Sequence, residues 1–173
     1  MTRTIDISDY VTLPPNNETI VFKHGDTDDI IAVIQKMDAI CSEKRFLKDF
    51  APQLEGATME ETLKNVFYCA KQNFQYAIDA PGKEKIKSPA WMLYYRVGDC
   101  KSYSVFIADC LRELQISCVF RFVGFDATDK TPTHVFVVAT MGTKKYTLDA
   151  ISRDLDFNEQ APGIKFRKDI KIS

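Results

Sequence analysis

The chain has 173 residues, a length that fits one domain with a sizeable hydrophobic core. Hydrophobic residues make up 45% and charged residues 27% of the chain, which excludes a disordered or fibrous protein. Lysine and arginine number 23 against 24 for aspartate and glutamate, so the chain lacks the positive field that attracts nucleic acid or anionic lipid.

The sequence also lacks the features of membrane-inserted, disulfide-stapled and metal-binding proteins. No apolar run approaches the roughly 20 residues that cross a bilayer, and Met1-Thr-Arg-Thr-Ile-Asp6 has no apolar stretch of a secretory signal. We therefore expect no membrane partner and a cytoplasmic location. The five cysteines contain no C-x-x-C pair and only two histidines are present, so we expect no disulfide framework, no metal site and no cofactor.

The first part of the chain predicts an arm followed by two helices. Residues 1–25 contain Pro14-Pro15-Asn16-Asn17 and one short apolar strand at 19–22, which indicates an irregular arm. From Asp26 to Cys41, apolar residues recur at helical spacing. Thr58-Met-Glu-Glu61 matches a capping box, which predicts a second helix that ends near Tyr76.

The middle of the chain leads to the clearest predicted helix. The basic run Lys83–Lys87 lies between Pro81-Gly82 and Ser88-Pro89, and we interpret it as a solvated loop. After Gly98-Asp99, apolar residues from Tyr103 to Leu114 fall on one side of a helix that has Cys100 in its first turn.

Extended segments follow this helix, at residues 118–123, 134–138 and 145–149. Helices followed by a run of strands predict an α+β fold, with helices packed on a mostly antiparallel sheet. We assign residues 26–152 to the main domain. The polar residues 153–173 then form either an edge of the same domain or a loose tail.

Cys100 is the candidate nucleophile. A thiol attacks as the thiolate, and unpaired N–H groups at a helix N-terminus favour that charged form. We expect Gly98 to allow a tight backbone turn that presents the sulfur at a cleft, and the Cys100 N–H to be an oxyanion donor.

His134 and Asp149 are the candidate base and orienting carboxylate. A turn at Met141-Gly-Thr-Lys144 predicts a hairpin that sets Asp149 opposite Val135 or Phe136, within a diagonal step of His134. An aspartate bonded to one imidazole nitrogen leaves the other nitrogen free to exchange a proton with a thiol. The three residues together predict a Cys-His-Asp triad.

The sequence resembles the transglutaminase-like superfamily, whose members are rearranged relatives of papain. The resemblance rests on Gly98-Asp99-Cys100, Thr133-His-Val-Phe-Val137 and Thr147-Leu-Asp-Ala150, and it extends upstream to Phe74-Gln-Tyr76 and Ser88-Pro-Ala-Trp-Met-Leu93. It covers residues 58–152 and is strongest toward small bacterial and prophage-encoded members. It implies a helix carrying the cysteine, packed on an antiparallel sheet that carries the histidine and aspartate.

The resemblance implies a cysteine-dependent hydrolase of peptide or other amide bonds that works through a thioester on Cys100. Its partner is a peptide or protein substrate, and a phage-encoded member would be associated with the virion. Relatives draw a second oxyanion donor from an upstream side chain, for which Tyr76 and then Trp91 are the candidates. The chain departs from many relatives at Lys101-Ser102, where acidic residues are common, and at Ala150, where proline is common.

Two alternatives to hydrolysis stay open on the sequence. One is acyl transfer to an amine, as in a transglutaminase. The other is a non-catalytic binding or assembly module of a phage or mobile element that keeps the fold. The oligomeric state is not encoded in any pattern that we recognise.

Other conspicuous residues have structural interpretations. We expect His24 to lie in an exposed polar turn, and four cysteines and four phenylalanines to pack in the interior. The cysteines are Cys41, Cys69, Cys110 and Cys118, and the phenylalanines are Phe120, Phe122, Phe125 and Phe136.

Overall fold

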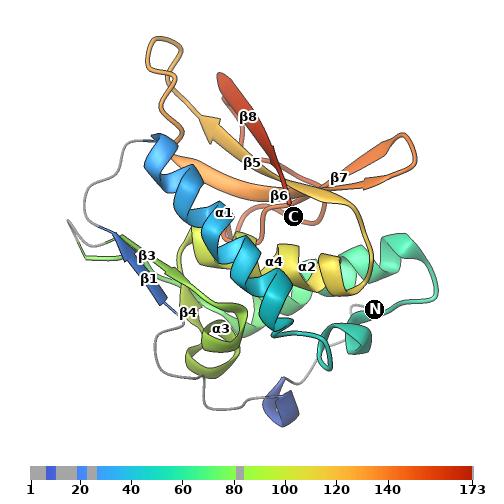
Figure 1. Ribbon diagram of the computed structural model, residues 1–173. Helices are drawn as coiled ribbons and strands as arrows, with labels where there is room; N and C mark the ends of the chain where they lie inside the picture. The colour runs from blue at the N-terminus through green and yellow to red at the C-terminus, as the bar shows by residue number, and fades with distance from the viewer. Residues whose placement is uncertain (1–6, 11–18, 23–26, 81–83, 173) are drawn as a thin grey trace.

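The computed structural model describes residues 7–10, 19–22, 27–80 and 84–172 (Figure 1). Most of the predicted arm, with His24, lies outside the described residues, as do the first residue of the basic run, Lys83, and the adjoining Pro81-Gly82. No helix in the described ranges is long and apolar enough to span a membrane.

Four α-helices precede the main sheet, and a capping side chain explains where each of the last three begins. They are α1 (Thr27–Lys44), α2 (Met59–Asn73), α3 (Pro89–Tyr95) and α4 (Cys100–Glu113), with short 3-10 turns at Ser8–Tyr10 and Ala51–Leu54. The predicted capping box begins α2, because the Thr58 hydroxyl accepts a hydrogen bond from the Glu61 N–H at 3.1 Å. This helix ends at Asn73 rather than near Tyr76, because Phe74 adopts an extended backbone.

Helix α3 was not expected from the sequence, although its start carries a recognisable signal. Ser88 caps it by accepting the Trp91 N–H at 3.1 Å, and Pro89 occupies the first helical position, where proline is favoured. Arg96 ends it in a left-handed conformation with φ of 57°.

The main sheet is antiparallel and has the strand order β7-β6-β5-β8. Its strands are β5 (Cys118–Gly124), β6 (His134–Met141), β7 (Lys144–Leu148) and β8 (Phe166–Lys171). Of the two alternatives for the C-terminal residues, the structure therefore has the edge strand. Two smaller pairs flank it: β1 (Thr19–Phe22) with β3 (Glu84–Lys87), antiparallel, and β2 (Gln75–Tyr76) with β4 (Val97–Gly98), parallel.

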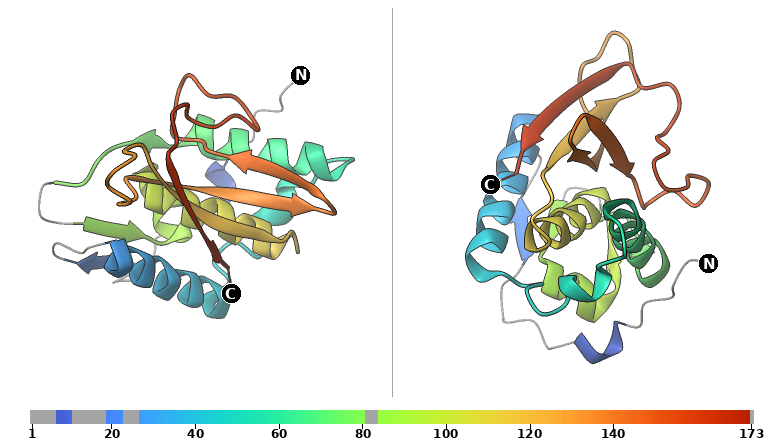
Figure 2. Two further views of the ribbon diagram at one scale, coloured as in Figure 1. Left: turned by 90° about the horizontal axis from the view of Figure 1, so that it is seen from above. Right: turned by 90° about the vertical axis from the view of Figure 1, so that its right-hand side faces the viewer.

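The predicted α+β architecture is confirmed, with the sheet forming one layer over the helices (Figure 2). Helix α4 lies against the sheet and is buried from Lys101 to Leu111, which makes it the central element of the core. Phe120 and Phe122 pack on this side, whereas Phe136 packs with Val123 on the other face. The fourth phenylalanine corrects the expectation, because Phe125 lies just beyond β5 and is 41% exposed.

The basic run is not a solvated loop, because residues 84–87 form the strand β3 and Lys87 is only 6% exposed. The Lys87 Nζ lies 3.5 Å from Asp79 Oδ1 and 5.0 Å from the centre of the Trp91 ring. A carboxylate and an aromatic face thus compensate for the water that the ammonium loses. Because β3 pairs with β1, which is distant in the sequence, the charge pattern of residues 84–87 alone does not predict a strand.

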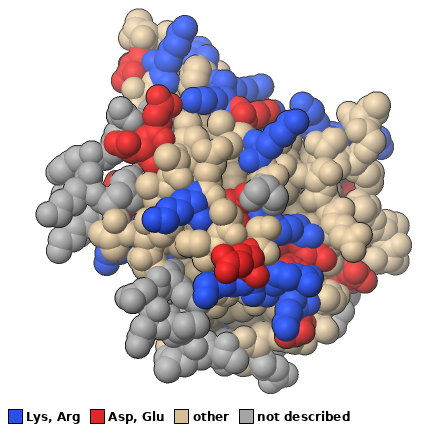
Figure 3. Space-filling view, viewed as in Figure 1, with Lys and Arg blue, Asp and Glu red and all other residues tan. Residues whose placement is uncertain are grey.

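Ion pairs join the helices both inside the protein and at its surface. Arg112 of α4 contacts both Asp38 of α1 and Asp109 of α4, and Arg45 lies 2.5 Å from Glu113. On the face shown in Figure 3, basic and acidic side chains are interspersed. This distribution agrees with a net charge of -1 and provides no single-sign surface on that face.

A buried hydrogen bond ties the start of α4 to the start of β6, and its loss should destabilise the fold. The Ser104 hydroxyl donates to the Val135 carbonyl oxygen at 3.1 Å. We expect Ser104→Ala to lower the free energy of unfolding by about 1 kcal/mol in urea denaturation. Ser42→Ala, at an exposed position of α1, is the matched control and should change it by less than about 0.5 kcal/mol. Equal effects of the two substitutions would contradict this role for Ser104.

Candidate active site

Cys100 is the first residue of α4, and Asp99 caps this helix. Asp99 Oδ1 accepts hydrogen bonds from both the N–H and the hydroxyl of Ser102, each at 3.1 Å. The cap satisfies one of the unpaired N–H groups of the first turn. Cys100 stands at the positive end of a long buried helix. The residue is partly exposed, so its sulfur remains accessible.

Gly98 is needed for close packing rather than for a tight turn. Among the described glycines, left-handed backbone occurs at Gly142 and Gly163 and not at Gly98. A Cβ on Gly98 would lie 2.6 Å from Met92 Sδ and 3.0 Å from Ser102 Cβ, so the buried Met92 side chain would have to move. The absence of a side chain therefore lets α3 approach the segment that leads to Cys100.

His134 and Asp149 meet because a two-residue turn joins β6 to β7. The strands pair from Met141 with Lys144 to Val137 with Leu148, so Asp149 follows directly after the last pair. Gly142 in the turn has φ of +58°, a conformation that favours glycine. His134 Nε2 lies 2.8 Å from Asp149 Oδ2, a hydrogen-bonding distance.

The environment of His134 favours the imidazolium. Burial alone would lower the pKa of His134, but hydrogen bonds to Asp149 and Cys100 and the charges of these groups raise it to about 9. Asp149 is 2% exposed, and its other oxygen, Oδ1, has no hydrogen-bond partner among the described residues.

Cys100 and His134 open into one cavity of about 290 Å³. Ile30 of α1, Phe122 of β5 and Val135 of β6 line it with apolar surface. The same cavity is bordered by Glu84, Lys101, Pro132 and Thr133. The two residues predicted to exchange a proton thus share a hollow whose walls come from a helix and the sheet.

The two oxyanion candidates lie in different places. Tyr76 pairs with Gly98 across β2 and β4, two residues before Cys100. Burial, followed by the nearby charges of Cys100 and Asp99, raises the pKa of the Tyr76 hydroxyl and keeps it a donor. Trp91 instead lies on α3, where its ring contacts Lys87 and its centre lies 4.4 Å from that of the tilted Tyr95 ring. Tyr76 lies close enough to Cys100 for their charges to interact, but neither Tyr76 nor Trp91 lines the cavity that Cys100 lines.

The remaining cysteines have the environment of structural thiols. Burial raises the pKa of Cys69 and of Cys118 to about 12, and it also raises the pKa of Cys110 well above its usual value. Cys41 is fully buried in the core. Of the five thiols, that of Cys100 lies beside the imidazole of His134 in a cavity.

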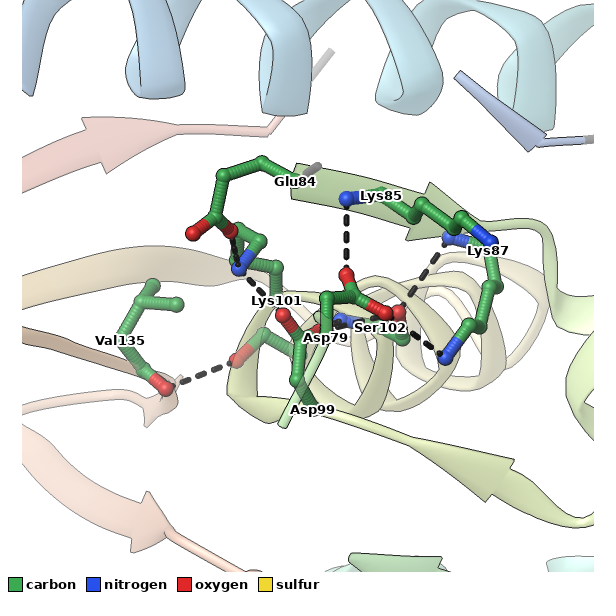
Figure 4. Close-up of polar contacts among 9 residues, drawn as sticks. Asp79, Glu84, Lys85, Lys87, Asp99, Lys101, Ser102 and Val135 are labelled. Atoms are coloured by element: carbon green, nitrogen blue, oxygen red, sulfur yellow. Dashed lines mark hydrogen bonds and ion pairs between the residues drawn. The ribbon is translucent and has the colours of Figure 1, made fainter. Parts of the chain in front are cut away.

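Sequence reasoning missed a polar network around the first turn of α4, which Figure 4 shows. Lys101 Nζ lies 2.6 Å from Glu84 Oε2 and also contacts Asp99 Oδ2. Oxygens of Asp79, Glu84 and Asp99 lie within 4.8 Å of one another. Lys87 and Lys101 place two ammonium groups against these three carboxylates, so most of their negative charge is already compensated. The only signal in the sequence was the departure at Lys101-Ser102.

Comparisons with known proteins find one matching family model and several similar folds. A family model described as a transglutaminase-like domain matches residues 45–171. Among solved structures, LapG from Legionella pneumophila aligns with a TM-score of 0.49 at 18% identity, over 76% of this chain and 80% of that chain. A Cytophaga hutchinsonii protein, provisionally described as a cysteine protease, aligns with a TM-score of 0.50 at 17% identity. The alignment covers 84% of this chain but 46% of the Cytophaga protein. A search of curated proteins finds no match.

The imidazole of His134 should titrate near pH 9. Because its folded pKa lies above the unfolded value of about 6.5, protonated His134 stabilises the fold fully below pH 6.5, and this contribution disappears as pH rises through about 9. The measurement is an NMR titration in a His24→Gln background, which leaves one histidine signal. Asp149→Asn should lower the midpoint by about one pH unit or more. A midpoint near 6.5 in the parent protein would contradict the imidazolium.

Proposed function

Because the chain belongs to the transglutaminase-like domain family, we propose that it is a cysteine-dependent hydrolase of peptide or other amide bonds. The observation that carries this proposal is the His134–Asp149 pair at 2.8 Å, placed beside a partly exposed cysteine at the start of a buried helix. This is the spatial arrangement that a thiol nucleophile, a proton carrier and an orienting carboxylate need.

The acylation step would use the proton that His134 holds. The Cys100 thiolate attacks the amide carbonyl carbon, a C–S bond forms, and the carbonyl electron pair moves onto oxygen. The Cys100 N–H and the Tyr76 hydroxyl are the proposed donors to this oxyanion. When the intermediate collapses, the C–N bond breaks and the imidazolium gives its proton to the leaving amine, which leaves a thioester on Cys100.

The deacylation step would return the site to its starting state. Neutral His134 removes a proton from water while the water oxygen adds to the thioester carbon, and the C–S bond then breaks. The products are a carboxylic acid, the Cys100 thiolate and protonated His134. Asp149 holds the imidazole in place through both steps and stabilises its charged form. An amine in place of the water would give acyl transfer instead.

The cavity supports a substrate with an apolar side chain near the bond that is cleaved. Its walls at Ile30, Phe122 and Val135 are hydrocarbon surfaces, and its volume of about 290 Å³ accommodates a side chain of the size of leucine or phenylalanine. We therefore propose peptides as the substrate class.

Selective alkylation of Cys100 tests the nucleophile. We expect iodoacetamide at pH 6 to label Cys100 at least about tenfold faster than any other cysteine, because the imidazolium favours the thiolate. His134→Ala should abolish this advantage, and His24→Ala, at the other histidine, should not. The measurement is site-resolved mass spectrometry of the native protein, followed by peptide substrates with and without an added amine. If Cys100 reacts no faster than the other thiols, a non-catalytic binding or assembly module becomes the better interpretation.

Filling the cavity tests the substrate class. Acetyl-leucine and acetyl-glycine chloromethyl ketones would be compared by their rates of adding to Cys100, measured by intact mass. We expect the leucine compound to react faster, and Ile30→Trp to reduce this preference about tenfold because the indole occupies the cavity. Ala32→Trp places the same ring at an exposed position of α1 and should leave the preference unchanged. Equal rates for both compounds in the parent protein would exclude an apolar pocket.

A further inference from the structure

The cap of α4 creates an electrostatic conflict at the proposed nucleophile. Asp99 is buried, and its Oδ1 accepts two hydrogen bonds from Ser102. Yet Asp99 is the residue next to Cys100, and a carboxylate beside a thiol opposes formation of the thiolate. Glu84 of β3 lies at the edge of the same cavity and adds a second negative charge.

Lys101 lies where it can resolve this conflict. It is only 8% exposed, borders the cavity, and directs its ammonium to Asp99 Oδ2 and, at 2.6 Å, to Glu84 Oε2 (Figure 4). Burial would lower the pKa of Lys101, but Asp99, Glu84 and Cys100 raise it above the usual range, so the side chain stays charged. A fully charged cation thus stands one residue after the nucleophile.

The surrounding contacts fix the position of Lys101 and of the strand that it reaches. The Lys87 N–H donates to the Ser102 hydroxyl at 3.2 Å, which joins β3 to the first turn of α4. Asp79 accepts the Lys85 N–H at 2.8 Å and pairs with the Lys87 ammonium. Asp79 and Lys87 neutralise each other, so Asp99 and Glu84 depend on Lys101.

We propose that Lys101 is a positioning residue for Cys100: an internal cation that neutralises the cap carboxylate of Asp99, so that the helix can keep its cap and the cysteine can ionise. This inference rests on the proposed function. The other titratable groups near Cys100 are His134, with Asp149 bonded to it, from the sheet, and Tyr76, from β2. Lys101 supports the thiolate without taking part in bond making or breaking.

The test compares Lys101→Met, Asp99→Asn/Lys101→Met and the control Lys64→Met. Lys64 pairs with Glu60 at 2.8 Å on the exposed side of α2, so its loss removes a lysine ion pair away from the cavity. The measurement is the rate of Cys100 alkylation by iodoacetamide from pH 5 to 10, with the thermal midpoint of each variant recorded by circular dichroism. Asparagine caps helices as well as aspartate does, so the double variant removes the uncovered charge and keeps the cap.

We expect Lys101→Met to slow alkylation at pH 6 about tenfold and to move the pH–rate profile upward by about one pH unit, as an uncompensated carboxylate beside a thiol requires. The double variant should recover most of the parent rate, and Lys64→Met should match the parent. If Lys101→Met does not fold, the double variant, which buries no orphaned charge at the cap, carries the test alone.

An unchanged profile in Lys101→Met, or a double variant as slow as the single one, would overturn the role of Lys101. A parent protein whose Cys100 reacts like an ordinary thiol would instead overturn the proposed function. The variants therefore test the role of Lys101, and the parent protein in the same experiment tests the proposed function.

Discussion

The packing of the first turns of α4 against the start of β6 is the contact on which the candidate site depends. Cys100 belongs to the helix and His134 to the strand, so only this interface brings sulfur and imidazole into one cavity. The bond from Ser104 to the Val135 carbonyl oxygen lies one turn after Cys100 and next to His134, so it sets the helix and the strand relative to each other at that point. Burial of α4 from Lys101 to Leu111 makes the arrangement rigid. Although the site is built from two elements, its geometry is therefore fixed by the packing of the core.

Local features of the sequence predicted the parts of the site that local geometry determines. The turn of Gly142 and Thr143 sets the pairing of β6 with β7, and counting along the strands from that turn places Asp149 beside the start of β6. The helix that begins after Asp99 likewise follows from its own periodicity and cap. In both cases the determining interactions span fewer than about 20 residues, which is the range over which pattern reasoning works.

The missed parts depend on pairing between distant segments. Residues 84–87 carry a charge pattern typical of a loop, and they form a strand because β1, more than 60 residues earlier, supplies a partner. Lys87 and Lys101 are buried because carboxylates from other elements compensate their charges, and no periodicity reveals such a partner. The reason for a glycine at position 98 was missed in the same way, because the atoms that crowd this position most belong to the Met92 side chain and not to the turn itself.

These observations connect the cap of a helix with the chemistry at its first residue. A helix N-terminus favours a thiolate, but the residues that cap it best are Asp, Asn and Ser, and an aspartate partly cancels the favourable field. Asparagine would avoid the conflict, yet Asp99 also accepts the Lys101 ammonium, and that ion pair draws Glu84 and the edge of β3 toward the cavity. The carboxylate thus organises the cavity wall as well as the helix. In the proposed role of Lys101, the charge of Asp99 is tolerated beside Cys100 because the lysine is held against it, and Asp99, Lys101 and Glu84 then act as one unit.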